Sequence, residues 1–181
     1  MGINMKMIKG FLFVVTGLFI LITLVSLLMP SRIMTAKTVM INSDDSSIMA
    51  AIQDLQQWKN WHPVFMDEQA GVKIPGPSAG ANAYAVWETN GKENKLQITN
   101  STPGQVTLSL QRPGENEVIN LFSLATIKDS PGIQVEWRTT TTLKWYPWEK
   151  FSGIFYDKMT GPGYEAALQS LKKYAEGRPA P

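Results

Sequence analysis

Cysteine is absent from the 181-residue chain, and histidine occurs once, as His62. Without cysteine the chain can form no disulfide, thiolate zinc site, iron–sulfur cluster or cysteine nucleophile. A lone histidine also argues against a metal site with several histidine ligands and against a Ser–His triad. The sequence thus offers no visible catalytic or metal-binding constellation, and we expect no cofactor.

The folded part of the chain also lacks an excess of positive charge. The net charge is +2, but residues 1–37 hold four basic side chains and no acidic one (Lys6, Lys9, Arg32 and Lys37). The remaining residues hold 13 basic and 15 acidic side chains, a net charge of −2. Proteins that bind nucleic acid gather Lys and Arg against phosphates. We therefore expect no nucleic acid partner.

A long uncharged stretch runs from Phe11 to Met29 and ends at Pro30. A helix needs about 20 residues to cross about 30 Å of hydrocarbon. We predict that residues 1–35 form a membrane anchor, with the lipid bilayer as its partner. One alternative is a cleaved signal peptide, but Met34 stands where its cleavage site requires a small residue. The other is a buried soluble helix, which would normally show a polar stripe.

The basic residues around this stretch bear on its orientation. Lys6, Lys9 and the α-amino group precede it, whereas Arg32 and Lys37 follow it. Because positive charge favours the cytoplasmic side, the small excess before the span predicts a cytoplasmic N-terminus and an extracytoplasmic domain.

The domain, predicted for residues 36–176 with a tail at 177–181, begins with a short β-prone run at 36–42. Asp44 and Asp45 then offer side-chain oxygens that can cap a helix. Ile48, Ile52 and Leu55 follow at helical spacing, which predicts a helix that ends near Trp58.

Short runs separated by Gly- and Pro-rich turns follow between residues 69 and 142, a pattern typical of an antiparallel meander. The predicted strands are 83–88, 96–99, 106–112, 118–128 and 133–142. Alternation in the last strand places Val135, Trp137 and Thr139 on one face. We therefore expect one covered face of the sheet and one solvated face.

The end of the chain returns to a helical pattern. Gly161-Pro162 indicates a helix start or a kink, and Leu168, Leu171 and Ala175 continue an apolar stripe that begins at Tyr164. The element order predicts an α+β domain in which a curved antiparallel sheet wraps around its last helix.

Three motifs follow one another along the chain: Asp54-Leu55-x-x-Trp58-x-x-Trp61-x-Pro63, Gly80-Ala81-x-x-Tyr84-x-x-Trp87-Glu88 and Asp157-Lys158-Met159-x-Gly161-Pro162-x-Tyr164-Glu165. With the hydrophobic span and the Pro30-Ser31 step after it, they resemble membrane-anchored members of the polyketide cyclase/dehydrase group of the START-like (SRPBCC) superfamily. The resemblance covers residues 3–175. It implies a helix-grip fold, in which seven antiparallel strands grip the C-terminal helix around a cavity that often holds a hydrophobic small molecule or lipid.

The candidate ligand-binding residues are mainly aromatic: Trp61, Tyr84, Trp87, Arg112, Trp137, Trp145, Phe155 and Met159. Aromatic rings can line an apolar pocket, but core packing is the alternative for each. Trp145 and Trp148 could also lie among lipid headgroups. Arg112 could bind a ligand carboxylate or phosphate, or simply end its strand in solvent. His62 is expected at a surface or turn.

The sequence thus predicts a membrane-anchored START-like domain that binds a lipid or other hydrophobic molecule, with no evident catalysis. Two alternatives stay open. One is a polyketide cyclase/dehydrase-like enzyme that uses a cavity acid or base, for which His62, Glu88 and Arg112 are candidates. The other is a non-catalytic module that senses the envelope through a protein partner.

Overall fold

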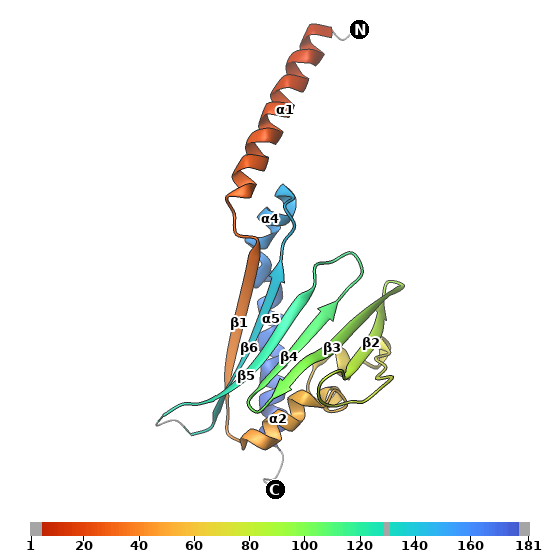
Figure 1. The fold of residues 1–181 in the computed structure, drawn as a ribbon, viewed down its shortest axis with the longest axis vertical. Coiled ribbons are helices and arrows are strands. Elements are labelled where there is room, and N and C mark those ends of the chain that lie inside the picture. Colours follow the sequence, from red (N-terminus) through yellow and green to blue (C-terminus); the bar gives the residue numbers. More distant parts are fainter. Residues whose placement is uncertain (1–4, 129–130, 178–181) are drawn as a thin grey trace.

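A computed structural model describes residues 5–128 and 131–177 (Figure 1). Of the predicted tail, residues 178–181 lie outside the described residues. The elements in chain order are α1 (Met5–Leu27), β1 (Arg32–Ile41), α2 (Asp45–Gln53), η1 (Gln57–Asn60), α3 (Pro63–Met66), η2 (Glu68–Ala70), β2 (Tyr84–Thr89), β3 (Lys92–Thr102), β4 (Gln105–Gln111), β5 (Val118–Thr126), β6 (Ile133–Thr142), α4 (Pro147–Gly153) and α5 (Tyr156–Glu176).

The strands form one antiparallel sheet in the order β1-β6-β5-β4-β3-β2. Strands β2 to β6 are a meander, and β1 pairs with β6 from Arg32↔Thr142 to Ile41↔Ile133. In Figure 1 the sheet curves beside α5, with α2 near one end. The α+β fold with a sheet around the last helix is therefore confirmed.

The number of strands differs from the seven that the family resemblance implies, because the described residues form six. Lys73, in the segment before β2, makes only an isolated bridge with Val86. Pro75 and Pro77 follow it and lack the N–H groups that a strand ladder needs. The pairing therefore stops after this bridge.

Helix α2 begins as predicted, with the Asp44 carboxylate accepting a hydrogen bond from the Ser47 N–H at 2.8 Å. The prediction that it continues to Trp58 is wrong. Asp54 leaves the helix and forms an isolated bridge with Ala79. Trp58 instead lies in the 3₁₀ helix η1.

Helix α5 packs along β1 and buries Ala167, Leu168, Leu171 and Ala175 against the core. Of the two interpretations of Gly161-Pro162, the helix start is wrong, since α5 begins at Tyr156 and holds Pro162 in its interior. Within the turns ahead of the proline, the Thr160 hydroxyl donates to the Tyr156 carbonyl at 2.8 Å.

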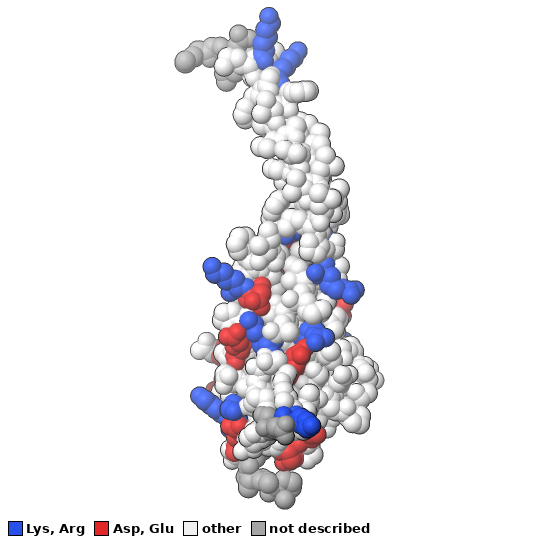
Figure 2. Space-filling view, turned by 90° about the vertical axis from the view of Figure 1, so that its left-hand side faces the viewer, with Lys and Arg blue, Asp and Glu red and all other residues white. Residues whose placement is uncertain are grey.

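Helix α1 projects from the domain with almost all of its side chains exposed (Figure 1). Among the described helices it alone is long and apolar enough to cross a membrane, with a mean hydropathy of 2.6 over an 18-residue window. Its exposure rules out the buried soluble helix, whereas a signal sequence meets the same test of length and composition. Figure 2 shows basic side chains near the far end of α1 and no charged side chain along the rest of the helix, whose sequence has none after Lys9.

Candidate ligand-binding site

A cavity of about 340 Å³ lies between the sheet, α3 and the first half of α5. Its volume is at the small end of the range for ligand pockets, which runs from about 300 to 1,000 Å³. Sixteen residues line it: Trp58, His62, Pro63, Val64, Phe65, Trp87, Leu96, Leu110, Arg112, Asn120, Trp137, Met159, Thr160, Gly163, Tyr164 and Ala167. The helix–sheet interface is therefore not solidly packed.

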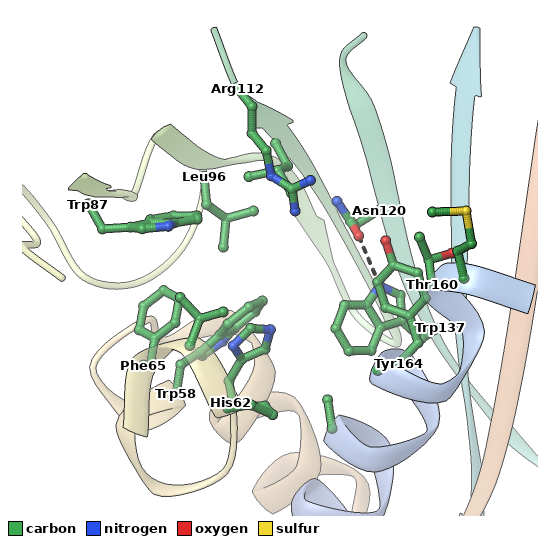
Figure 3. A pocket seen from close by; sticks show the side chains of 16 residues that line it. Trp58, His62, Phe65, Trp87, Leu96, Arg112, Asn120, Trp137, Thr160 and Tyr164 are labelled. Carbon is green, nitrogen blue, oxygen red and sulfur yellow. Dashed lines mark hydrogen bonds between the residues drawn. The ribbon is translucent and has the colours of Figure 1, made fainter. Parts of the chain in front are cut away.

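One wall consists of aromatic rings from η1, from His62 and from α3 (Figure 3). The imidazole of His62 stacks on Trp58 with ring centroids 4.8 Å apart, and the centroid of the Phe65 ring lies 5.2 Å from that of Trp58. The Trp58 indole N–H donates to the Ile52 carbonyl at 2.9 Å. Because its only polar atom is bonded within the protein, Trp58 offers the cavity an apolar surface.

The opposite wall is built by β5, β6 and α5. The Trp137 indole N–H donates to Asn120 Oδ1 at 3.0 Å, and Asn120 Nδ2 donates to the Val118 carbonyl at 3.2 Å. Tyr164 of α5 meets the Trp137 ring edge-on at 4.8 Å. The polar atoms of this wall thus bond largely to one another, which leaves ring surface toward the cavity (Figure 3).

His62 adds no charge to the cavity at neutral pH. Burial lowers the pKa of this imidazole to about 4, because a desolvated site disfavours the charged form. Its Nδ1 atom is inaccessible to solvent and has no hydrogen-bond partner among the described residues. The sequence predicts His62 at a surface or turn; it is the N-cap residue of α3, and its ring lines the cavity.

Arg112 is the only charged side chain among the sixteen lining residues. It directly follows β4, and its Nη1 donates to Glu115 Oε2 at 3.0 Å. Tyr156 lies nearby; burial, together with the Tyr164 hydroxyl, raises the pKa of its phenol. One end of an otherwise apolar cavity therefore carries a cation and hydroxyl groups.

Four of the eight predicted site residues line the cavity: Trp87, Arg112, Trp137 and Met159. They reach it from four different elements or their ends: β2, β4, β6 and α5. The structure thus brings together residues that are up to 72 positions apart in the sequence.

The other four predicted residues are absent from the lining. Trp61 is fully buried in the core, where its indole N–H donates to the Ala51 carbonyl at 3.0 Å. Tyr84 packs under the ammonium of Lys95, 5.0 Å from its ring centroid. Trp145 and Phe155 are exposed on the outside of the domain. Trp61 is therefore a core residue, whereas Trp145 and Phe155 belong neither to the core nor to the cavity lining.

The predicted site residues do not include several lining residues, foremost Trp58, Phe65 and Asn120. Others carried a usable signal. Leu110 shares strand parity with Arg112, and Tyr164 lies on the apolar stripe of the last helix. Among the described residues, no three His, Asp or Glu side chains gather closely enough to hold a metal ion.

Comparison of the sequence with family models and with curated proteins finds no match. Solved structures do match the fold. A START superfamily protein from Mycobacterium smegmatis superposes with a TM-score of 0.59 at 17% identity, covering 80% of this chain and 97% of that one. A protein from Chromobacterium violaceum gives a TM-score of 0.58 at 13% identity, with 81% and 99% coverage.

A di-domain ARO/CYC protein, BexL from the BE-7585A biosynthetic pathway, is also similar, with a TM-score of 0.59 at 14% identity. The match covers 82% of this chain but 52% of that protein, so the chain spans about half of BexL. At these identities the comparisons establish the fold. The chain therefore has the START-like fold, formed by a curved antiparallel sheet and a long C-terminal helix with a cavity between them.

Proposed function

We propose that this protein is a membrane-anchored START-like domain that binds a hydrophobic small molecule or lipid between the sheet and α5. The observation that carries the proposal is the cavity of about 340 Å³ walled by Trp58, Trp87 and Trp137. Apolar pockets with a few polar groups are typical of small-molecule sites. Helix α1, with its length and hydropathy, is the proposed anchor.

The distribution of charge suggests the chemistry of the ligand. An apolar body would lie against the rings, and an acidic or hydrogen-bond-accepting group would lie near Arg112. A guanidinium carries five N–H donors, and Glu115 accepts from one nitrogen of Arg112. A ligand carboxylate or phosphate could accept from the same side chain, since guanidinium binds both groups well.

A cyclase-like enzyme is the second candidate, and the position of His62 on the cavity wall favours it. A general base works best when its pKa is near the working pH. The pKa of His62 is lowered to about 4, so this imidazole is a weak base at neutral pH. Binding is therefore the function that the site supports best.

A fluorescent fatty acid, 11-(dansylamino)undecanoic acid, tests the proposal on the full chain in phosphatidylcholine nanodiscs. Energy transfer from the cavity tryptophans to the dansyl group reports binding. Gly163 lines the cavity, and a Cβ added there meets no atom within 4 Å, so Gly163→Leu should fill the cavity without a clash at the backbone. Ala166→Leu is the matched control, because Ala166 lies on the same helix but not in this cavity.

We expect saturable transfer in the wild type and in Ala166→Leu, and only the unsaturable signal of probe dissolved in lipid in Gly163→Leu. Equal transfer in all three chains would overturn the proposal for this cavity.

A further inference from the structure

Six exposed apolar side chains gather at the end of the domain where α1 joins it. They are Trp145, Trp148, Phe151, Ile154, Phe155 and Met159, here named the α4 surface. They belong to α4, to its flanking residues and to the first turn of α5, and they are between 37% and 77% exposed. Large exposed apolar patches usually mark an interaction site.

The α4 surface is ordered by ring stacking. The rings of Tyr146 and Trp148 stack with centroids 5.0 Å apart and an interplanar angle of 4°, and the Trp145 ring contacts Tyr146 with centroids 5.0 Å apart. Pro147 begins α4 directly between the stacked residues. The aromatic side chains therefore hold one another in place while their outer faces stay exposed.

The α4 surface is also tied to the exit of α1. Lys150 of α4 is only 4% exposed, and its ammonium donates to the Met29 carbonyl at 3.4 Å and to the Ser31 hydroxyl. The Leu143 N–H, just before the α4 surface, donates to the Ser31 carbonyl at 2.7 Å. Only four residues separate the end of α1 from β1, a connection that can span at most about 14 Å.

We propose that the α4 surface inserts into the interfacial layer of the leaflet from which α1 emerges. This inference rests on the proposed membrane anchor. Helix α1 has 23 residues and is about 35 Å long, so it spans the hydrocarbon with little to spare. The short linker then holds α4 at the headgroups (Figure 1). Trp and Tyr are enriched at this depth because their rings have an apolar body and a polar edge.

Insertion would also set the orientation of the cavity. Met159 belongs both to the α4 surface and to the cavity lining, and Thr160 and Gly163 continue the lining along α5. The end of β4, which Arg112 follows, points toward the same end of the domain as α4 (Figure 1). An apolar ligand could then pass between the bilayer and the cavity without crossing bulk water.

The absence of cysteine permits a direct test with single nitroxide labels on the full chain in phosphatidylcholine vesicles. Ile154→Cys reports on the α4 surface. Met66→Cys on α3 is the matched control, because Met66 is 54% exposed and Ile154 is 62% exposed. Leu18→Cys, within α1, reports on the anchor itself. Collisions with oxygen and with a water-soluble nickel complex, present on both sides of the membrane, give the depth of each label.

We expect the labels at 18 and 154 to be shielded from nickel at least several-fold more than the label at 66. If the label at 18 is shielded but nickel reaches the labels at 154 and 66 equally, the insertion of the α4 surface is overturned, while the membrane anchor is still supported. Nickel access at 18 equal to that at 66 would overturn the anchor and this inference together. Shielding of the label at 154 that appears only when a second protein is added would also contradict insertion into lipid.

Discussion

The indole N–H of Trp137 donates to Asn120 Oδ1 at 3.0 Å across β5 and β6. Both side chains are buried, so the bond removes the one polar atom of the indole from the cavity wall. The Trp137 ring can therefore face an apolar ligand without an unsatisfied donor.

Asn120→Leu should leave the Trp137 N–H buried without an acceptor. A buried donor that loses its partner costs about 1–3 kcal/mol, so we expect a decrease of that size in the free energy of unfolding, measured with urea on the detergent-solubilised chain. Adding Trp137→Phe to Asn120→Leu removes the orphaned donor. If the losses in the free energy of unfolding caused by Asn120→Leu and by Trp137→Phe simply add in the double variant, the lost hydrogen bond does not cause the effect of Asn120→Leu.

Stability should fall between about pH 6.5 and pH 4 because of His62. The folded state holds the pKa of this imidazole at about 4, whereas an unfolded histidine has a pKa of about 6.5. The unfolded state therefore binds more protons in this window, and the stability present at pH 7 is lost as the pH falls, on the order of 2–3 kcal/mol in all.

His62→Phe should flatten the pH profile in that window. The pKa of Asp44 is held at about 2, chiefly by its hydrogen bond from Ser46, so its contribution is lost only at lower pH. The two effects can thus be separated in urea titrations at several pH values. A wild-type profile that matches His62→Phe between pH 4 and 6.5 would rule out a buried neutral imidazole.

Arg112→Gln should weaken binding of the dansylated fatty acid about tenfold, while the methyl ester of the same probe binds with little change. A charge-assisted hydrogen bond contributes about 1.5–3 kcal/mol, and about 1.4 kcal/mol is a tenfold change in Kd. Glu115→Gln is the control, since it removes only the partner that already holds Arg112. Equal losses for acid and ester would mean that Arg112 does not recognise the acidic group.

Lys150→Met should loosen the junction between α1 and the domain. The substitution keeps an unbranched side chain of similar length but removes the ammonium that bonds Met29 and Ser31. Pulsed electron resonance between labels at Leu18→Cys and Ile119→Cys should give a broader distance distribution in the variant. An unchanged distribution would show that the backbone pairing of β1 with β6 fixes the junction by itself.

Much of the fold could be predicted from local patterns. Alternation placed Val135, Trp137 and Thr139 on the covered face of β6, and all three are buried. The apolar stripe at Leu168 and Leu171 marked the buried side of α5. The buried face of a strand or helix follows from the spacing of apolar residues within that element, so it can be predicted from the local sequence.

The errors arose where distant contacts decide the outcome. Pro162 signals a helix start locally, yet α5 begins six residues earlier, at Tyr156. Trp145, Phe155, Trp58 and Trp87 are all aromatic residues. Only the fold decides that the first two lie on the outer surface and the last two line the cavity. His62 stacks on Trp58 and lines the cavity, an arrangement that no spacing in the sequence reveals.

Native mass spectrometry of the full chain, released from detergent micelles as purified, tests the central claim most directly. We predict one apolar small molecule per chain on the wild type and on Ala166→Leu, and its loss from Gly163→Leu, whose new side chain would fill the cavity. A wild-type chain at its bare mass, or the same adduct on Gly163→Leu, would contradict the claim that this cavity binds a hydrophobic ligand.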